Sequence, residues 1–559
     1  MMLVMLIAIP LLAAALVVAA PESRTRAIAT LGSLAPVAWF GWLASTFNWT
    51  NGFTQFDYTV AWFEPLGLSF SVGVDSISML LIGLTVLLGP ICVIGSYTAA
   101  TVRIKTYYSW LLILQAAMTG VFCAKDVILF YVFFEFTLVP MYILINLYGS
   151  TNRKAAATKF FLYTFTGSLV TLAGLVYVAY RHAGLNNGEW TFSIAILEQT
   201  CREFGPSEQG MVFWAMMAGF AIKVPLFPVH TWLPLAHTEA PTAGSVVLAG
   251  VLLKLGTYGL YRFALQFCPA AAVEYAPLLA VICCIGILYA GLICWVQTDV
   301  KKLVAYSSVS HLGFCILGMF ALNATGLQGS ILYMINHGLS TGALFLMIGM
   351  IYERYHTRSM KELGGLAAKM PIWSTFMVFF TMASVGLPGT NGFVSEFMCL
   401  FGAFQAGGTT WSGLTGSTLL PIGATLGRLG PYVAFVAGTG MIVTAMYLLY
   451  MLGKIVWGPL VEPAGHHGHG DAHGGADEHH GPLPRDLSMR EIGLLLPLAA
   501  LCLGLGLYPS SMIRTIEAPT RATAALMEKT MSARVKAVAL SGEEASPSVT
   551  AVKAREVAE

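Results

Sequence analysis

The sequence has few charged residues and lacks the short motifs that bind redox cofactors or nucleotides. Asp, Glu, Lys and Arg make up only 10% of the 559 residues, whereas a soluble domain carries about 25%. The ten cysteines form no CxxC pair, and the adjacent Cys283 and Cys284 lie within an apolar run. Their spacing therefore predicts neither a disulfide framework nor an iron–sulfur cluster. Neither a GxGxxG loop after a strand nor a P-loop occurs, so the sequence indicates no nucleotide site.

The charge balance also gives no indication of a nucleic-acid partner. The net charge is only +2, and the basic residues do not cluster as binding to phosphates requires. The sequence is instead rich in apolar residues, because 57% of its residues are hydrophobic. A water-soluble globule could not bury so many of them, so we expect the chain to lie in a lipid bilayer.

Apolar stretches long enough to cross a bilayer, about 20 residues each, recur along the chain. The first, residues 1–20, lacks a basic n-region, and we interpret it as a span rather than a signal peptide. We predict an all-α polytopic membrane protein with about fourteen transmembrane helices. Their expected ranges are 2–20, 27–47, 74–97, 107–124, 127–149, 159–181, 210–236, 243–266, 275–297, 301–322, 326–352, 372–406, 431–457 and 491–513.

The distribution of Lys and Arg predicts the orientation of these spans. Fifteen of them fall in loops after odd-numbered spans and five in loops after even-numbered spans. Cytoplasmic loops carry the excess of Lys and Arg, so the odd-numbered loops are expected in the cytoplasm. Both termini would then lie on the non-cytoplasmic side of a bacterial inner membrane.

Four ionisable residues lie deep within predicted spans: Glu135, Lys223, Lys254 and Glu396. Placing one charge at the centre of a transmembrane helix costs roughly 2.5–3.5 kcal/mol on insertion scales. One interpretation is that they form buried ion pairs that lock helices together. Such pairs seldom offset their desolvation, and intramembrane charges typically mark ion or proton pathways. We therefore favour a proton pathway.

Two of the predicted spans contain residues that interrupt a helix. Pro225 and Pro228 follow Lys223 in the seventh span, and Pro388 and Gly389 precede Glu396 in the twelfth. Proline removes a backbone donor, and a broken helix at membrane depth is tolerated only where it is buried in protein or lines a wet cavity. Paired breaks at corresponding places indicate a transport site.

The two breaks are five spans apart, and a repeat of an odd number of spans must insert upside down relative to its copy. Spans 4–8 and 9–13 are therefore predicted to form two inverted five-helix repeats. The expected segments are an N-terminal three-helix segment at 1–106, the repeats at 107–266 and 275–457, a His-rich cytoplasmic loop at 458–490, a last span at 491–513 and a polar tail at 514–559.

Histidines occur in two settings. His311 and His337 lie in spans between Lys254 and Glu396 along the chain. Each could simply be hydrogen-bonded to a neighbour, but imidazole exchanges protons near neutral pH and suits a relay.

Six more histidines occur in the glycine-rich loop, where metal storage or sensing is one interpretation. Glycines leave no preformed geometry, so adventitious binding is favoured and no metal site is predicted. These six are His466, His467, His469, His473, His479 and His480.

Several motifs resemble those of a known family. They are the runs around Glu135 and Lys223, together with residues 230–237 (HTWLPLAH), 240–244 (APTAG), 299–308 (DVKKLVAYSS) and 387–389 (LPG). They resemble the antiporter-like membrane subunits of respiratory complex I, the proton-translocating NADH–quinone oxidoreductase, and related cation/proton antiporters. The resemblance covers about residues 60–515. The L and N types usually carry a lysine in the twelfth helix, so Glu396 resembles the M type.

The resemblance implies proton translocation coupled to quinone reduction in partner subunits. It assigns the pathway to Glu135 paired with Lys223, followed by Lys254, His311, His337 and Glu396. The expected partners are other membrane subunits of the complex, especially the L and N types. NADH, FMN, iron–sulfur clusters and quinone are expected in partner subunits, with no cofactor in this chain. The alternatives are a subunit of a multisubunit sodium/proton antiporter, a subunit of a membrane-bound hydrogenase-type complex, and a purely structural spacer.

Overall fold

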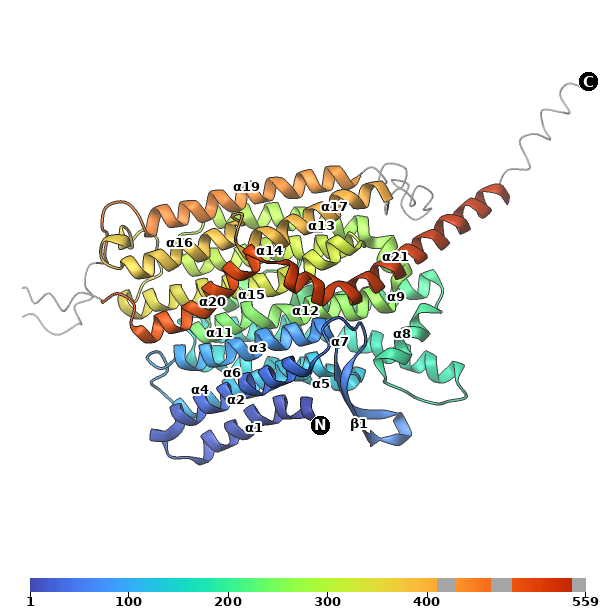
Figure 1. Ribbon diagram of the computed structural model, residues 1–559, viewed down its shortest axis with the longest axis horizontal. Helices are drawn as coiled ribbons and strands as arrows, with labels where there is room; N and C mark the ends of the chain where they lie inside the picture. The colour runs from blue at the N-terminus through green and yellow to red at the C-terminus, as the bar shows by residue number, and fades with distance from the viewer. Residues whose placement is uncertain (410–428, 464–484, 545–559) are drawn as a thin grey trace, which may run out of the picture.

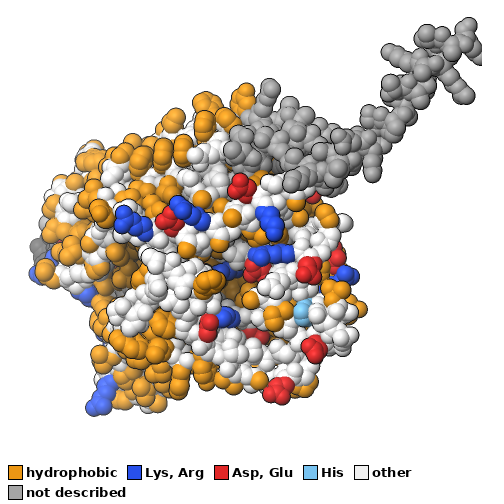
Figure 2. Space-filling model, turned by 45° about the vertical axis from the view of Figure 1, so that its right-hand side comes forward, with side chains coloured by type: hydrophobic (Ala, Val, Ile, Leu, Met, Phe, Trp, Pro, Cys, Tyr) orange, Lys and Arg blue, Asp and Glu red, His pale blue; other side chains and the backbone are white. Residues whose placement is uncertain are grey.

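The computed structural model describes residues 1–409, 429–463 and 485–544. Within these ranges the chain is a bundle of long helices that run side by side along the horizontal direction of Figure 1. Its flank is covered largely by hydrophobic side chains, whereas charged side chains gather towards the end turned to the viewer in Figure 2. A lipid-facing flank between polar ends fits a protein that crosses a membrane.

The N-terminal segment contains a feature that the all-α prediction missed. Helices α1 (Met2–Ala19) and α2 (Thr25–Thr46) are followed by two strands, β1 (Gln55–Phe63) and β2 (Leu68–Val74), before α3 (Ser76–Gly95) begins. The strands pair antiparallel, with Thr59 opposite Ser71. Gly67 closes the hairpin with φ +62°, a left-handed conformation that glycine adopts without steric cost. The prediction of an all-α chain is therefore wrong for this loop.

The first predicted repeat is made of short and long helices with several irregular joints. Asp126 caps the N-terminus of α5 by accepting hydrogen bonds from the backbone N–H groups of Ile128 and Leu129. The elements of this part are α4 (Ile104–Cys123), α5 (Val127–Phe136), α6 (Leu138–Tyr148), α7 (Arg153–Leu185), α8 (Ile194–Arg202), α9 (Pro206–Lys223), α10 (Leu233–Glu239), α11 (Thr242–Val247), η3 (Leu248–Leu252), α12 (Leu253–Gly259) and η4 (Leu260–Leu265).

The second predicted repeat and the C-terminal part have longer helices. They are α13 (Pro269–Trp295), α14 (Val300–Phe320), α15 (Ala324–Tyr355), α16 (Pro371–Val385), α17 (Asn391–Thr409), α19 (Leu429–Ile455), α20 (Met489–Leu507) and α21 (Ser510–Glu544). Asp299 caps α14 through the backbone N–H groups of Lys301 and Lys302. The described part of the predicted polar tail belongs to a helix: α21 packs along α13 and α15, and Arg534 forms an ion pair with Glu274 at 3.0 Å.

Eleven helices in the described ranges are long and apolar enough to cross a membrane. Each of the fourteen predicted ranges coincides with helical structure, but α4, α9 and α17 are not among the eleven, and α16 is shorter. The chain is thus a multi-pass helical membrane protein, and the number fourteen stays a prediction.

The structure interrupts a helix at both predicted places. Helix α9 ends at Lys223, and α10 begins only at Leu233, with Pro225 and Pro228 between them. Helix α16 ends at Val385 and α17 begins at Asn391. Gly386 and Gly389, between these helices, have φ of +82° and +93°, which turns the backbone out of the helical path.

The centre of the bundle is formed by α14, α15 and the segment from α11 to η4. In their most apolar windows, 94% of the residues of α14 and all those of α15 and residues 242–265 are buried inside the protein. By contrast, only 28% of the corresponding window of α2 is buried. Polar groups on the central helices are therefore shielded from lipid by other helices, which is where intramembrane charge is tolerated.

Candidate functional site

Glu135 and Lys223 lie near one another where α5 and α9 meet. Lys223, the last residue of α9, is buried, and its Nζ donates to Thr137 Oγ1 at 3.3 Å and lies 4.5 Å from the centre of the Phe134 ring. Phe134 and Thr137 lie within two positions of Glu135 in the chain, and the Glu135 carboxylate is near enough to interact electrostatically with Lys223. No ion pair within 4.0 Å joins them, and both carboxylate oxygens lack a hydrogen-bond partner among the described residues. The predicted pair is therefore separated here.

Lys254 is a fully buried cation in an irregular part of its helix. It lies on α12, between the π-helical segments η3 and η4, and π-type segments are frequent at functional sites. Its Nζ donates to the carbonyl oxygen of Ala249 and lies 2.7 Å from His337 Nδ1. None of the ion pairs between described residues includes Lys254, so its strongest polar side-chain contact is an imidazole.

From His337 the polar chain continues to Glu396. The ring centres of His337 and His311 are 5.9 Å apart. His311 Nδ1 lies 2.7 Å from the hydroxyl of Tyr333 and 3.3 Å from Glu396 Oε1. The Tyr333 hydroxyl donates to the same carboxylate oxygen at 2.5 Å. Helices α12, α14, α15 and α17 thus bring together four of the six predicted pathway residues, with Tyr333 as a junction.

A small cavity lies beside this junction. Its volume is about 10 Å³, roughly the smallest that admits one water molecule. His311, His337, Ser384 and Glu396 are among the residues that line it. The Nε2 atoms of both histidines and Oε2 of Glu396 have no protein hydrogen-bond partner in the described ranges. The cavity therefore joins the groups that would have to exchange a proton.

Sequence reasoning missed Tyr333 and His237. Tyr333 lies one helical turn from His337 on α15, a spacing that would place both on the same face. His237, on α10 just after the first break, is completely buried, and its ring stacks on Phe345 with 4.5 Å between centroids. Neither ring nitrogen has a hydrogen-bond partner in the described part of the chain. Lys301 and Lys254 both lie close enough to His237 to interact with its imidazole ring electrostatically.

A much larger cavity of about 820 Å³ opens where α15 ends. Its lining includes Glu239, Lys301, Arg354, Arg358 and Arg490. Two of these side chains reach the region of the first broken helix. Glu239 accepts a hydrogen bond from the backbone N–H of Asn152 at 2.9 Å, and Lys301 Nζ donates to the carbonyl oxygen of Ala240 at 2.5 Å.

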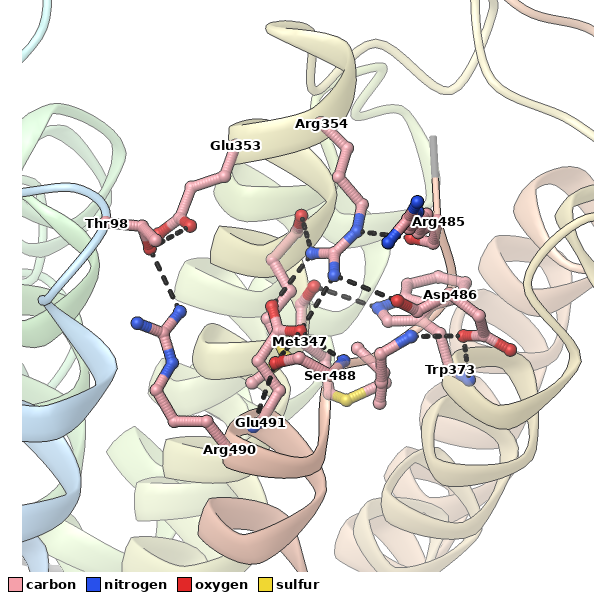
Figure 3. A network of polar contacts seen from close by, with 12 residues as sticks. Thr98, Met347, Glu353, Arg354, Trp373, Arg485, Asp486, Ser488, Arg490 and Glu491 are labelled. Atoms are coloured by element: carbon pink, nitrogen blue, oxygen red, sulfur yellow. Dashed lines mark hydrogen bonds and ion pairs between the residues drawn. The ribbon is translucent and has the colours of Figure 1, made fainter. Parts of the chain in front are cut away.

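One wall of the large cavity is held by a polar network, shown in Figure 3. Arg354 on α15 binds both carboxylate oxygens of Glu491 on α20, at 2.9 and 2.8 Å. Glu491 also completes a capping box with Ser488 at the start of α20. On the same wall Thr98 donates to Glu353 at 2.6 Å and accepts from Arg490 at 3.2 Å. These contacts join the ends of α3, α15 and α20 and keep the cavity wall in place.

One buried ion pair lies outside the predicted pathway. Asp75 caps α3 and pairs with Arg262 on η4, which also contacts the hydroxyl of Tyr258. Arg262 lies within the predicted span 243–266, on a π-helical turn that the apolar pattern does not distinguish from the preceding helix. Asp75 and Arg262 satisfy one another, which fits a structural pair.

The six histidines of the glycine-rich loop, for which metal binding was the less favoured interpretation, cannot be located on the fold. His466, His467, His469, His473, His479 and His480 all lie outside the described residues. Within the described ranges no group of three or more His, Cys, Asp or Glu side chains is placed to hold a metal ion.

The chain is similar to proteins of one family over most of its length. Residues 124–421 match the family described as NADH:quinone oxidoreductase/Mrp antiporter, transmembrane part. The chain is 39% identical over 485 residues to NADH-quinone oxidoreductase subunit M of Rhodobacter capsulatus, covering 84% of each protein. It is 40% identical over 460 residues to NADH-ubiquinone oxidoreductase chain 4 of Marchantia polymorpha, covering 81% of this chain and 86% of that one.

Solved structures show the same architecture. A chain of respiratory complex I from Thermus thermophilus with bound NADH superposes with a TM-score of 0.79 at 27% identity, over 94% of this chain and all of that one. A chain of the Mrp complex from Dietzia sp. superposes with a TM-score of 0.75 at 23% identity, over 96% and 98% of the two chains, and shows a shared fold. The family match and the 39% identity to a subunit M agree with the broken helices and the buried contact between lysine and histidine. The protein belongs to the family of antiporter-like membrane subunits of NADH:quinone oxidoreductase and Mrp antiporters.

Proposed function

We propose that the protein carries protons across the membrane as an antiporter-like subunit of NADH–quinone oxidoreductase. The observation that carries this proposal is the 2.7 Å contact between Lys254 Nζ and His337 Nδ1, continued through His311 and Tyr333 to Glu396. A spacer that used charge only to join helices would pair its lysine with a carboxylate. Instead, a buried ammonium group faces an imidazole, which accepts a proton near neutral pH.

The proposed membrane arrangement has fourteen spans in two inverted five-helix repeats, spans 4–8 and 9–13. The breaks after Lys223 and after Val385 support it, because they occur five predicted spans apart and flank the buried charges. Both termini lie on the non-cytoplasmic side of a bacterial inner membrane, and the large cavity beside Arg354 opens to the cytoplasm. The excess of Lys and Arg in the odd-numbered loops supports this orientation.

Protons are taken up through the large cavity, whose lining includes Glu239 and Lys301. His237 is near enough to both Lys301 and Lys254 to interact with them electrostatically, and its unpaired ring nitrogens suit it to pass a proton inward. From Lys254 the proton moves to His337 and His311, and then to Glu396. It leaves on the opposite side of the membrane.

The Glu135–Lys223 pair acts as the gate. An opposite charge within about 4–6 Å stabilises the charged form of a lysine, and its removal makes the proton easier to release. One pKa unit corresponds to about 1.4 kcal/mol, so a small movement is sufficient to load or release a proton. The absence of a direct ion pair between these described residues corresponds to the separated state of this gate.

The driving energy comes from quinone reduction in partner subunits. NADH, FMN, iron–sulfur clusters and quinone belong to those partners, and this chain contributes no redox cofactor. Its neighbours in the membrane are other antiporter-like subunits, including the L and N types. The relatives named as subunit M and chain 4 support this assignment over a subunit of a sodium/proton antiporter. The shared fold with the Mrp complex keeps that antiporter as the second candidate.

NADH-driven proton uptake in inverted membrane vesicles tests the proposal. Wild type and Glu135→Gln are compared at matched assembly of the complex. We expect Glu135→Gln to lose most of the uptake, because a neutral amide no longer changes the proton affinity of Lys223. Unchanged uptake with unchanged NADH oxidation would reject the gate. Sodium-dependent growth with no effect on NADH oxidation would favour the antiporter instead.

A further inference from the structure

Two cysteines far apart in the sequence meet at one end of the bundle. Cys201 lies at the end of α8 and Cys268 immediately before α13, and their Sγ atoms are 3.5 Å apart. All ten cysteines of the chain are described and buried, and this is the only pair whose sulfur atoms contact one another. The pairing cannot be recognised from spacing, since 67 residues separate the two positions.

Hydrogen bonds hold the two cysteine-bearing segments together on both sides of the sulfur atoms. Arg202 Nε donates to the carbonyl oxygen of Gln266 at 2.8 Å. Gln209 donates to the carbonyl oxygen of Arg202 and accepts from the backbone N–H of Ala270, both at 3.1 Å. Arg202, Gln266 and Ala270 each lie one or two positions from a cysteine, and Gln209 contacts both segments. The approach of the sulfur atoms is therefore set by the backbone and not by two freely rotating side chains.

The side of the membrane on which these cysteines lie favours oxidation of their thiols. Helix α8 lies at the same end of the bundle as the β1–β2 hairpin, on the right of Figure 1. In the proposed orientation this end faces the non-cytoplasmic side, where disulfides form and persist. This step rests on the proposed orientation and is independent of the proton pathway.

We propose that Cys201 and Cys268 form a disulfide that ties α8 of the first predicted repeat to the start of α13 in the second. The two thiols lose two electrons and two protons as the sulfur–sulfur bond forms. The acceptor is the disulfide of an oxidised dithiol protein, which is reduced to two thiols. Formation of the bond shortens the sulfur separation from 3.5 Å to roughly 2.05 Å.

Burial also affects how readily these thiols and their disulfide exchange. Burial, reinforced by the neighbouring Cys201 thiol, raises the pKa of Cys268 well above its ordinary value. The thiolate is the form that attacks a disulfide, so a buried Cys268 exchanges slowly. Once the bond has formed, the same burial protects it from reductants.

Differential alkylation of the complex in native membranes tests the inference. Membranes are dissolved in SDS with N-ethylmaleimide, which labels free thiols; they are then reduced and treated with iodoacetamide, and peptides are assigned by mass spectrometry. We expect Cys201 and Cys268 to carry the second label and the other eight cysteines the first. Cys201→Ser should move Cys268 to the first label, whereas Cys123→Ser should leave both on the second.

First-step labelling of both residues in wild type would overturn the proposal. Stability provides an independent readout that does not require pumping. Cys201→Ser, Cys268→Ser and the double variant should lower the melting temperature of the complex equally, because each removes the same bond. Additive decreases would also overturn the proposal. NADH-driven proton uptake, measured in the same membranes, reports on the proton pathway separately from the thiol labelling.

Discussion

Lys254 Nζ and His337 Nδ1 lie 2.7 Å apart at the centre of the bundle, although the two residues are separated by 83 positions in the chain. Both side chains are buried, and Lys254 has no carboxylate partner among the ion pairs of the described residues. Since an isolated buried charge is costly, this contact suits a proton shared between two bases better than a fixed ion pair.

Lys254→Met is expected to leave the complex assembled but to reduce NADH-driven proton uptake by roughly tenfold or more, corresponding to at least about 1.4 kcal/mol. Methionine fills a similar volume but carries no proton. The measurement is uptake in inverted vesicles, normalised to assembled complex. Lys302→Met, at an exposed position on α14, is the control and should pump normally. A normal ratio of protons pumped to NADH oxidised in Lys254→Met would remove Lys254 from the pathway.

Tyr333→Phe removes the hydroxyl that contacts both His311 and Glu396. Loss of one hydrogen bond of this kind costs about 1 kcal/mol, so we expect roughly fivefold slower proton uptake with little change in assembly. Stopped-flow acidification of a pH dye inside inverted vesicles measures the rate. Tyr306→Phe, a half-buried tyrosine on α14, is the matched control. If both variants pump at the wild-type rate, Tyr333 is only a packing residue.

His237→Gln tests the uptake route. Glutamine keeps polar atoms beside Phe345 but cannot carry a proton, so uptake should decrease roughly tenfold or more, corresponding to at least about 1.4 kcal/mol. His182→Gln, at the C-terminal end of α7 and bonded to Thr200, should have no such effect. If protons reach Lys254 by another route, His237→Gln will match this control.

Gly386→Ala tests the second helix break. Gly386 has φ +82°, and an added Cβ would lie 2.7 Å from Glu396 Oε2. We expect about 1–2 kcal/mol of lost stability from the left-handed backbone, together with reduced pumping because Glu396 must move. Thermal unfolding in detergent measures the first effect. Gly438→Ala on α19, where no atom lies within 4 Å of the added Cβ, should be neutral, and equal melting temperatures would show that the break tolerates a side chain.

The sequence determined the features that depend on local chemistry and on the solvent. Lipid requires about 20 apolar residues for each span, so the helices of the bundle could be recognised from composition. Prolines lack a backbone donor, so the end of α9 at Lys223 was expected. A charge in an apolar run is costly enough to require a reason, which identified Glu135, Lys223, Lys254 and Glu396.

Only the tertiary structure decided which of these groups meet. Tyr333 looks like one more aromatic residue in an apolar helix until its hydroxyl is seen between His311 and Glu396. The β1–β2 hairpin and the Cys201–Cys268 contact were likewise not predicted, because the spacing of these residues in the sequence does not indicate that they pair. Hydrophobic burial is nondirectional and sets where helices lie, whereas a hydrogen bond or a proton transfer requires atoms within about 3 Å. That precision comes from the packing of whole helices, and a single sequence does not encode it in any local pattern.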